Sequence, residues 1–564
     1  MIPVTRFLRV MPMVVLVTTL LSCSDSGTEP PPPEPDPEPA SVVIIAPVDT
    51  LTSIGERRQL SAEVLDIDGT VLVDQAVSWS VVNPQVLRVS ASGEIVSLGN
   101  GSTVVIARNG TIADSVALTV HQRAARVTLA APTDTVFALG VRSRWSVALA
   151  DSLGRPLPDG FTPTEWSSSA PGVATVDSDG LVTPVGNGAV QVSASADGAV
   201  RTVTLVVQSE APVEIDLALA ESLQWALEDS ASAYELIGVS AAVVVPGQGV
   251  WSGVYGRSRP DAVMRPSLSF GFASITKTVV GAVVMDLVED GILSLTDQVS
   301  DWLAPLPNIS DNATVGQLLQ HLTGFDDFAQ HPQIWTQAQA DLNRWWLPEE
   351  VITSFVDDPP AFAPGAAFSY SNTNYPVLGM IIEQATGATL AAEMRSRLWT
   401  PMGLNSFYLG GETPIGSMAT GWSDVNGNGQ LVDITQFIGT STHSMRWAAG
   451  GIIANAADMA RWGAGIYGSN VVLDAGTIDQ MVQFVSSNAG LVWTGSGLGV
   501  LQYQLAGQET WGHAGAVRGF SSLMVYSPST GISVAVGVNQ DDGSHPLTHF
   551  RITTALLTLA TAGL

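Results

Sequence analysis

Basic side chains are scarce in this 564-residue chain, which carries 23 Lys and Arg against 52 Asp and Glu and a formal net charge of −29. Binding to nucleic acid needs a positively charged surface that meets the phosphates, so this composition argues against a nucleic-acid partner. An acidic surface more often serves solubility and identifies no partner by itself. The length exceeds what one hydrophobic core usually holds, and we expect two to four domains.

Cysteine is almost absent, because Cys23 is the only one, and no intramolecular disulfide can form. No long apolar run precedes it either: the segment Val10–Leu21, which follows two arginines, is too short to span a bilayer comfortably. The sequence Leu-Leu-Ser-Cys that ends there resembles the lipobox of bacterial lipoproteins, in which cleavage leaves the cysteine lipid-modified. We therefore expect residues 1–22 to be a lipoprotein signal peptide. A lipid on Cys23 would anchor the exported protein in the bacterial cell envelope, periplasmic or at the cell surface, with ordinary signal cleavage nearby as the alternative.

Residues 23–40 are rich in Pro and Glu and contain seven prolines. Proline fixes φ and removes backbone donors, so this stretch cannot form a core. We expect an extended polyproline II linker of about 3.1 Å per residue.

The stretch from residue 41 to 208 repeats itself. Trp79, Gly93 and the Gly-Asn-Gly at 99–101 recur 87 residues later, among short β-rich runs broken by Gly, Asn, Asp and Pro. This pattern predicts two small antiparallel sandwiches, at 41–122 and 125–208. Through "SGEIVSLGNG" and "DGLVTPVGNG" both copies resemble the bacterial immunoglobulin-like type 2 domain. The resemblance implies a stalk or, less often, an adhesive surface, and we favour a stalk because neither copy clusters catalytic residue types.

Residues 213–564 have long helical patterns in the middle and strand patterns at both ends. The runs 239–245 and 250–255 flank a Pro-Gly-Gln-Gly turn, and the runs 519–526 and 532–538 flank a second turn. Strands at both ends predict one antiparallel sheet built from both termini, with a helical subdomain formed by the residues between them, an α+β domain. The cleft between sheet and helices is the expected site.

A nucleophile and a base stand together at the start of an apolar helix that we expect to run to Asp290 and close on Gly291. Ser274 and Lys277 are three residues apart, so both lie on one helix face and within hydrogen-bond reach. A neutral amine can take the hydroxyl proton, and the backbone N–H of Ser274 can stabilise an oxyanion at the helix N-terminus. An N-cap serine followed by a solvated lysine is the plain alternative.

Two further stretches carry polar groups that can face this pair. Tyr370 and Asn372 are two residues apart in an extended segment, so both side chains point the same way. A phenol can relay a proton to a leaving group, and an amide can hold the lysine or the substrate, although a turn that caps the next helix is the alternative. In the strand before Phe520, His513 offers a donor, Gly515 permits close approach, and the amide of Ala516 can be the second oxyanion donor.

The order Ser-x-x-Lys, Tyr-x-Asn, His-x-Gly resembles the serine hydrolases of the class C β-lactamase and D-alanyl-D-alanine carboxypeptidase superfamily. The resemblance includes "LLQHLTGF" at 318–325 and "AAGGIIANAADMARW" at 448–462. It implies that Ser274 is acylated, that Lys277 and Tyr370 move protons, and that water releases the acyl group. It further implies substrate contacts for three residues, Asn372, His513 and Gly515. No cofactor and no catalytic metal is implied.

His513 departs from the β-lactamase pattern, where lysine is usual as the cation that meets a substrate carboxylate. Strong β-lactamase activity is therefore in doubt, and Arg518 is a candidate for carboxylate recognition instead. We expect a carboxypeptidase or other D-peptidase acting on peptidoglycan stems or D-peptides, or an esterase. A weak β-lactamase and a non-hydrolytic protein that binds the cell wall or acts as an adhesin are the alternatives.

One polar loop between the motifs has the spacing of a calcium site. Oxygen ligands recur at Asp424, Asn426, Asn428 and, further on, Asp433, with a glycine at the sixth position of the loop. The twelfth position holds Thr435 where a bidentate Glu is usual. A plain Asn/Gly-rich turn is the alternative.

Overall fold

The computed structural model describes the chain from residue 37 onward, apart from 133, 137–138, 141, 159–164, 210–214, 413–416, 487–491 and 542–546. The predicted signal peptide, Cys23 and most of the linker lie outside the described residues. Within the described part, no helix has the length and apolar character needed to cross a bilayer. Contacts divide the chain into two compact units, one of residues 1–123 with 151–155 and one of residues 124–150 with 156–564.

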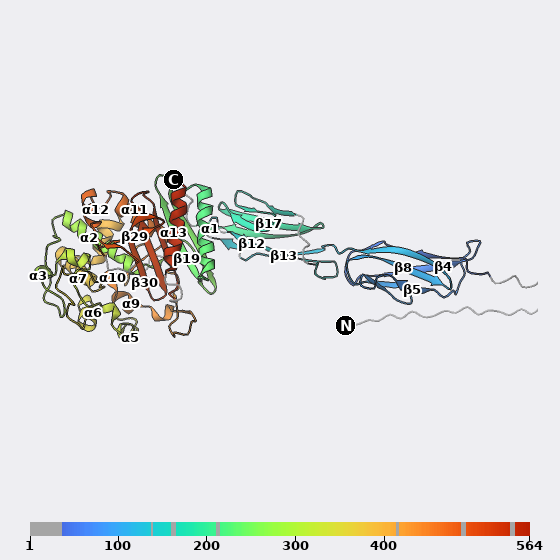
Figure 1. Cartoon of the computed structure of the whole chain (residues 1–564), viewed down its shortest axis with the longest axis horizontal. Helices are drawn as coiled ribbons and strands as arrows, with labels where there is room; N and C mark the ends of the chain where they lie inside the picture. The colour runs from blue at the N-terminus through green and yellow to red at the C-terminus, as the bar shows by residue number, and fades with distance from the viewer. Residues whose placement is uncertain are drawn as a thin grey trace, which may run out of the picture. The chain divides into compact units, whose positions relative to one another are not determined.

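Among the described residues up to Val207, every element is a strand (Figure 1). The first set is β1 (Ser41–Ile45), β2 (Thr50–Leu51), β3 (Arg57–Gln59), β4 (Ser61–Leu65), β5 (Ser78–Val81), β6 (Leu87–Val89), β7 (Glu94–Ser97), β8 (Gly101–Asn109) and β9 (Ile112–Val120). The second set is β10 (Arg126–Ala130), β11 (Thr135–Val136), β12 (Ser143–Arg144), β13 (Ser146–Ala150), β14 (Glu165–Ser168), β15 (Ala174–Val176), β16 (Leu181–Pro184), β17 (Gly188–Ala196) and β18 (Ala199–Val207). The sheet orders β1-β4, β2-β9-β8-β5 and β3-β7-β6 recur as β10-β13, β11-β18-β17-β14 and β12-β16-β15, as an internal repeat requires.

The repeated Trp and Gly positions have one structural cause. Gly93 has a φ of +84°, and a Cβ there would lie 3.1 Å from the ring of Trp79 and 2.6 Å from a backbone oxygen. Gly180 has a φ of +77°, and a Cβ there would lie 2.6 Å from the ring of Trp166. Each turn thus needs glycine both for its left-handed backbone and for its close approach to the tryptophan. This strand-rich region agrees with two all-β domains, and their immunoglobulin-like type stays a prediction.

The C-terminal domain is built on a nine-stranded sheet in the order β21-β20-β19-β32-β31-β30-β29-β28-β27. Its strands come from both ends of the domain, as the sequence predicts. From the N-terminal end come β19 (Gly238–Val245), β20 (Gly249–Arg259) and β21 (Ala262–Val263). From the C-terminal end come β27 (Val485–Ser486), β28 (Gly495–Ser496), β29 (Leu501–Leu505), β30 (Gln508–Val517), β31 (Phe520–Tyr526) and β32 (Ser533–Val538). β19 pairs with β32, which joins the two ends of the domain into one sheet.

Helices cover both faces of this sheet. α1 (Leu217–Ala233) and α13 (Thr548–Ala562) pack side by side on one face, as Figure 1 shows, and share one apolar core with it. On the other face α11 (Ala456–Gly468) contacts β19, β31 and β32, and a larger core joins it to the helical subdomain.

The subdomain consists of short helices and small strands. Its helices are α2 (Thr276–Glu289), α3 (Val299–Trp302), α4 (Val315–Leu319), α5 (Ile334–Ala340), α6 (Pro348–Phe355), α7 (Asn374–Thr386), α8 (Leu390–Glu393), α9 (Thr440–Ser444), α10 (Trp447–Gly450) and α12 (Ala475–Met481). Tighter or wider turns are η1 (Ala273–Ile275), η2 (Phe328–Gln330), the π-helical η3 (Met394–Trp399) and η4 (Thr435–Phe437). Small strands are β22 (Phe270–Gly271), β23 (Tyr408–Leu409), β24 (Trp422–Ser423), β25 (Val432–Asp433) and β26 (Ile452–Ala454).

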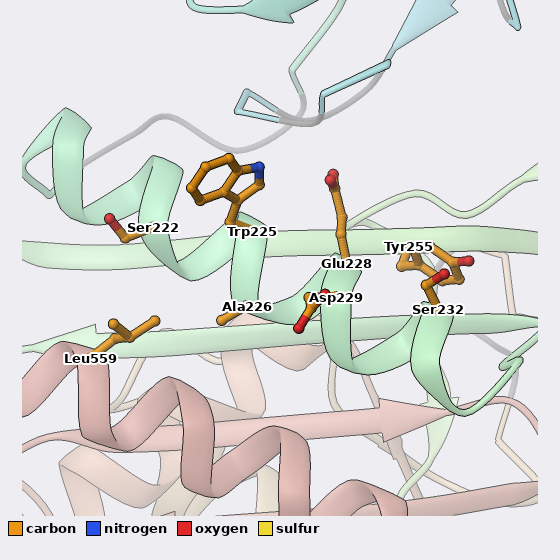
Figure 2. Close-up of a pocket in the computed structure, with 8 residues that line it drawn as sticks. All are labelled: Ser222, Trp225, Ala226, Glu228, Asp229, Ser232, Tyr255 and Leu559. Atoms are coloured by element: carbon orange, nitrogen blue, oxygen red, sulfur yellow. The ribbon is translucent and has the colours of Figure 1, made fainter. Parts of the chain in front are cut away.

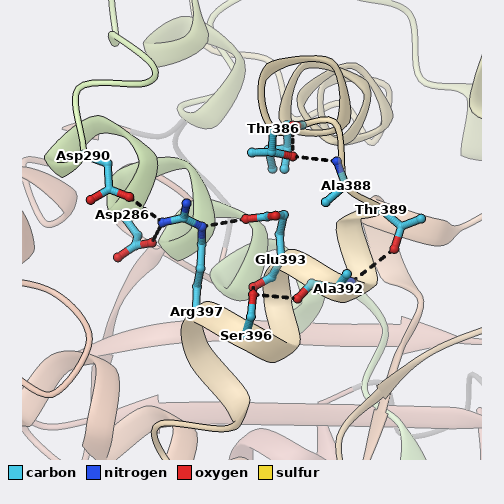
Figure 3. A network of polar contacts seen from close by, with 10 residues as sticks. Asp286, Asp290, Thr386, Ala388, Thr389, Ala392, Glu393, Ser396 and Arg397 are labelled. Atoms are coloured by element: carbon cyan, nitrogen blue, oxygen red, sulfur yellow. Dashed lines mark hydrogen bonds and ion pairs between the residues drawn. The ribbon is translucent and has the colours of Figure 1, made fainter.

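Helix α2 is buried on almost every side, which explains its apolar sequence. Its last residue is Glu289 and its C-cap is Asp290, close to the predicted end. Gly291 closes the helix as predicted, because it has a φ of +69° and the N–H of Ile292 reaches back to the carbonyl of Leu287. Two carboxylates, Asp286 and Asp290, lie in or just after its last turn. Their negative charge is unfavourable there, because the C-terminal end of the helix dipole is also negative. Arg397 of η3 donates to both, and its Nε lies 2.6 Å from Glu393 (Figure 3).

Replacing Arg397 with methionine is expected to lower the free energy of unfolding by about 2 kcal/mol, between the values for exposed and buried ion pairs. Burial already raises the pKa of Asp286, and without Arg397 its carboxylate loses its counter-ion. Urea unfolding followed by tryptophan fluorescence measures the change. Arg461→Met is the control, since Arg461 makes a single pair with Asp458 and is expected to change stability by about 0.5 kcal/mol or less.

Candidate active site

Ser274 lies in the turn η1 directly before α2, and this turn is strained. Ala273 has a φ of +48°, unusual for a residue with a side chain. The Thr276 hydroxyl holds the turn, because it donates to the Ala273 carbonyl at 2.6 Å and accepts from the Ile452 N–H at 2.9 Å. Ser274 remains partly exposed between two buried neighbours. The turn therefore presents the hydroxyl on a rigid support.

Lys277 is fully buried, and its amine has three oxygen neighbours. Nζ lies 3.1 Å from Ser274 Oγ, 2.8 Å from Asn372 Oδ1 and 2.6 Å from the Ala449 carbonyl. Burial lowers the pKa of Lys277 to about 7, against a smaller opposing effect of Asp327. A neutral amine has two N–H groups and one lone pair. Because Asn372 Oδ1 and the Ala449 carbonyl can only accept, they take both N–H groups and leave the lone pair for the Ser274 hydroxyl.

Asp327 is a residue that the sequence did not single out. Its Oδ2 accepts from Asn372 Nδ2 at 3.0 Å and its Oδ1 from the Asn372 N–H at 3.2 Å. An ionised carboxylate only accepts, so Asp327 fixes which end of the Asn372 amide turns toward Lys277. Asp327 is the second residue after the "LLQHLTGF" stretch, but one carboxylate in a chain this acidic carries no signal of its own.

Asp327→Asn is expected to lower kcat/KM by about 10²-fold, a value within the range for lost positioning. The new amide has one acceptor oxygen for two Asn372 donors, the backbone N–H and Nδ2, so one bond is lost and the Asn372 amide is no longer fixed with its oxygen toward Lys277. The double variant Asp327→Asn with Asn372→Asp restores an amide-to-carboxylate contact and is expected to recover at least about tenfold. A carboxylate beside Lys277 also raises its pKa, so the acid limb of the pH–rate profile should move to higher pH. Equal activity in the single and double variants would contradict this role.

Tyr370 and the residues around it form the second part of the site. A hydrogen bond links the Tyr370 phenol to Ser274, and burial raises the pKa of Tyr370 above its usual range, so it stays protonated. The ring of His321 stacks on Tyr370 with centroids 4.3 Å apart. His321 is neutral, because burial holds its pKa well below the usual value, and its Nδ1 lies 3.2 Å from the donating N–H of Ser371. The stretch 318–325 thus supports the Tyr370–Asn372 segment.

His513, Gly515 and Ala516 lie on β30 where it passes the nucleophile. A Cβ on Gly515 would lie 2.2 Å from the Phe272 carbonyl, so only glycine lets the strand approach the turn that holds Ser274. Ala516, the next residue, is exposed. The structure therefore brings β30 against the nucleophile turn at the point where a second oxyanion amide was expected.

His513 is neutral in this setting. It is 3% exposed, its ring lies 6.1 Å from that of Tyr370, and burial together with Lys277 lowers its pKa to about 3. Its Nδ1 lies 2.6 Å from the Ala514 carbonyl, so Nδ1 carries the proton and Nε2 is an acceptor. Among the residues that the structure describes, Nε2 has no hydrogen-bond partner. The sequence left open whether His513 carries a positive charge, and its burial keeps the imidazole uncharged.

The calcium-like loop is a hairpin turn between β24 and β25. Asp424 accepts from the N–H groups of Asn428 and Gly429 at 3.0 and 2.7 Å, and Asp433 accepts from that of Thr435. These bonds are those of a polar turn, the alternative interpretation, and occupy both Asp424 oxygens. In the described part of the chain no group of three or more His, Cys, Asp or Glu could hold a metal ion. Calcium binding by the four residues stays a prediction.

A hollow of about 750 Å³ lies on the outer side of α1 (Figure 2). Its lining includes Ser222, Trp225, Glu228 and Tyr255, and burial raises the pKa of Glu228 to about 7. Two serines, Ser222 and Ser232, line the hollow, and no lysine or histidine is among the described residues that line it. It lies with α1 on the side of the sheet away from Ser274, so it is separate from the site described above.

Comparison with known proteins assigns the C-terminal domain to a family. A model of the family described as "Beta-lactamase" matches residues 219–556. The chain is 29% identical to esterase EstB of Burkholderia gladioli over 199 residues, 33% of this chain and 50% of the esterase. It is 28% identical to penicillin-binding protein 4 of Amycolatopsis lactamdurans over 327 residues, 54% of this chain and 80% of that protein. The chain spans half the length or less of the first curated relatives that it matches.

Among solved structures, a D-amino acid amidase from Ochrobactrum anthropi SV3, determined with L-phenylalanine amide, superposes with a TM-score of 0.55 and 25% identity. The match covers 62% of this chain and all of the amidase. The family model covers residues 219–556, so the strand-rich N-terminal region lies outside it.

Proposed function

Because the chain belongs to the beta-lactamase family of serine hydrolases, we propose that its C-terminal domain cleaves amides or esters through an acyl-enzyme on Ser274. The observation that carries the proposal is that Lys277 Nζ lies 3.1 Å from Ser274 Oγ and also contacts two obligatory acceptors, Asn372 Oδ1 and the Ala449 carbonyl. In the neutral amine these acceptors take both N–H groups, so the lone pair is left for the Ser274 hydroxyl. An amine with a pKa of about 7 is a competent base at neutral pH.

In the proposed reaction, Ser274 Oγ forms a bond to the substrate carbonyl carbon while Lys277 takes the hydroxyl proton. The N–H groups of Ser274 and Ala516 stabilise the oxyanion. Tyr370, protonated and bonded to Ser274, passes a proton to the leaving amine or alcohol as its bond to the carbonyl carbon breaks, and Lys277 restores the phenol proton. Water then attacks the acyl-enzyme with the same groups in reverse roles, which releases the acid and regenerates Ser274.

The neutral state of His513 supports a preference among substrates. A cation at this position would attract a leaving group with a free carboxylate, but an uncharged imidazole with an acceptor Nε2 offers no such attraction. We therefore propose amides and esters with uncharged leaving groups, such as D-amino-acid amides and short esters, ahead of carboxypeptidase or β-lactamase substrates. The similarity to a D-amino acid amidase and to an esterase supports this order.

The full chain, incubated separately with p-nitrophenyl acetate, D-phenylalanine p-nitroanilide and a fluorescent penicillin, tests the proposal. We expect release of nitrophenol and nitroaniline, a transient acyl adduct in the intact mass, and a modified peptide that contains Ser274. The penicillin is expected to react more slowly than either. A folded protein that is not acylated by any of the three probes, or an adduct on another residue, would overturn the assignment.

For the N-terminal region we propose a lipid-anchored stalk, with acyl chains on Cys23 and immunoglobulin-like domains at 41–122 and 125–208 that hold the hydrolase away from the membrane. The repeated Trp–Gly packing and the seven prolines before it support a spacer. Metabolic labelling with a radioactive fatty acid should mark the protein and not Cys23→Ala. Equal labelling of both would overturn the anchor.

A further inference from the structure

A second, smaller cavity of about 150 Å³ is lined by residues that neighbour the proposed catalytic groups in the sequence. It is lined by two arginines, Arg446 and Arg518, and by apolar side chains that include Phe328, Trp335, Met445 and Val517. At about 30 Å³ for one water, it has room for a small polar group of a ligand rather than a whole one. Among the described residues that line it, none is acidic.

Both arginines lack a counter-ion among the residues that the structure describes. Arg518 lies over the ring of Trp335, 4.3 Å from its centroid, and Arg446 makes no ion pair with any described residue. Burial lowers the pKa of Arg446 to about 10, which reflects a cation held away from water without compensation. The chain has 52 acidic side chains against 23 basic ones, so two half-buried arginines without a carboxylate partner are unusual. Because a buried charge is costly unless it is paired, this arrangement suits the binding of an anion from outside the chain.

The cavity adjoins three segments that carry the proposed chemistry. Arg446 directly precedes α10, whose Ala449 carbonyl accepts from Lys277. Phe328 follows Asp327, and Arg518 comes two residues after Ala516. A Cβ built on Gly450 would lie within 4 Å of both Ala273, the neighbour of Ser274, and Arg446 Cβ.

The order of residues along β30 and the turn after it assigns the cavity to one end of the substrate. His513 lies on β30 beside Tyr370, and Arg518 follows the end of this strand, in the turn that leads to β31. Ala516, the proposed oxyanion donor, lies between them. If Tyr370 protonates the leaving group at the His513 end, the acyl part of the substrate extends toward the two arginines.

We propose that Arg446 and Arg518 bind a carboxylate carried by the acyl part of the substrate, so that the enzyme prefers acyl donors with an anionic end. This inference rests on the proposed hydrolase function. The apolar lining suits the methylene groups between the scissile carbonyl and the anion. A contact remote from the reacting bond acts alike in ground and transition states, so its effect belongs in KM.

Two esters that differ only in this charge test the inference, 4-nitrophenyl hydrogen adipate and 4-nitrophenyl methyl adipate. We expect the full chain to favour the anionic ester at least about tenfold in kcat/KM, mainly through KM. Arg446→Met and Arg518→Gln should each lower this ratio several-fold, and the double variant should bring it to about one. Arg551→Met is the matched control, because Arg551 also stacks on an aromatic ring, Tyr234, but on the other side of the sheet, and both rates should stay unchanged.

A ratio of one or below in the native chain, or a ratio that neither arginine variant lowers, would overturn the subsite while leaving the hydrolase assignment intact. Hydrolysis of neither ester would instead count against the proposed function. Binding is therefore also measured by calorimetry in Ser274→Ala, where the anionic ester should bind more tightly and lose this advantage when Arg446→Met is added. Equal binding of the two esters would reject the subsite. Arg446→Met removes an unpaired half-buried charge, so its melting temperature should not fall.

Discussion

Ser274→Ala is expected to abolish the acyl adduct and to lower kcat/KM for p-nitrophenyl acetate by about 10⁴-fold or more, because the atom that forms the covalent bond is removed. The side chain makes few other contacts that matter for folding, since the strained turn is held by Thr276 and Ile452. Stopped-flow release of nitrophenol and intact-mass detection measure the two effects. The oxyanion amides remain, so a small residual rate above that of water is consistent with the mechanism.

A matched serine provides the control. Ser222 lies in the hollow on α1, and its hydroxyl donates to the Ala218 carbonyl at 2.8 Å, an ordinary helix contact. Ser222→Ala should leave both the adduct and kcat/KM within about twofold of the native values. Loss of activity in Ser222→Ala with retention in Ser274→Ala would move the catalytic site to the other side of the sheet.

Much of the C-terminal fold could be predicted from local pattern. The hairpin of β19 and β20 follows from two apolar runs around a Pro-Gly-Gln-Gly turn, and the end of α2 follows from Gly291. The spacings within Ser274–Lys277 and Tyr370–Asn372 also predicted which groups could meet, since helix and strand periods fix the direction of neighbouring side chains. The structure places Ser274 in the 3-10 turn η1 directly before α2 rather than in the helix itself, and the left-handed conformation of Ala273 in this turn is one that no propensity signals.

Other features depend on contacts between distant segments and leave no local trace. Asp327 meets Asn372 across 45 positions of sequence, and Arg446 meets the end of β30 through the packing of α5 and α9 around a cavity. The neutral state of His513 is likewise set by burial rather than by residue type. The sequence names a residue as titratable, but its charge depends on surroundings that only the fold assembles.

Lys277→Met is expected to lower kcat by about 10³-fold, within the range for loss of a general base, and to remove a feature of the pH–rate profile. In the native enzyme the amine must be neutral to accept the Ser274 proton, and its pKa is about 7. Activity should therefore fall about tenfold per pH unit below this value and level off above it. Burial raises the pKa of Tyr370, so deprotonation of the phenol adds no basic limb in the neutral range. Rates on p-nitrophenyl acetate from pH 5 to 9 measure both features.

Stability separates this chemical role from a folding defect. Between the folded pKa of about 7 and the usual lysine value of about 10.4, the unfolded chain holds a proton on Lys277 that the folded chain does not. The native protein should therefore gain stability from this group as pH rises through that window, and Lys277→Met, which has no amine to desolvate, should lack this dependence and be at least as stable at pH 7. A methionine variant that is inactive yet equally or more stable identifies Lys277 as the base. Retention of the limb near pH 7 in that variant would assign the titration to another group and contradict the mechanism.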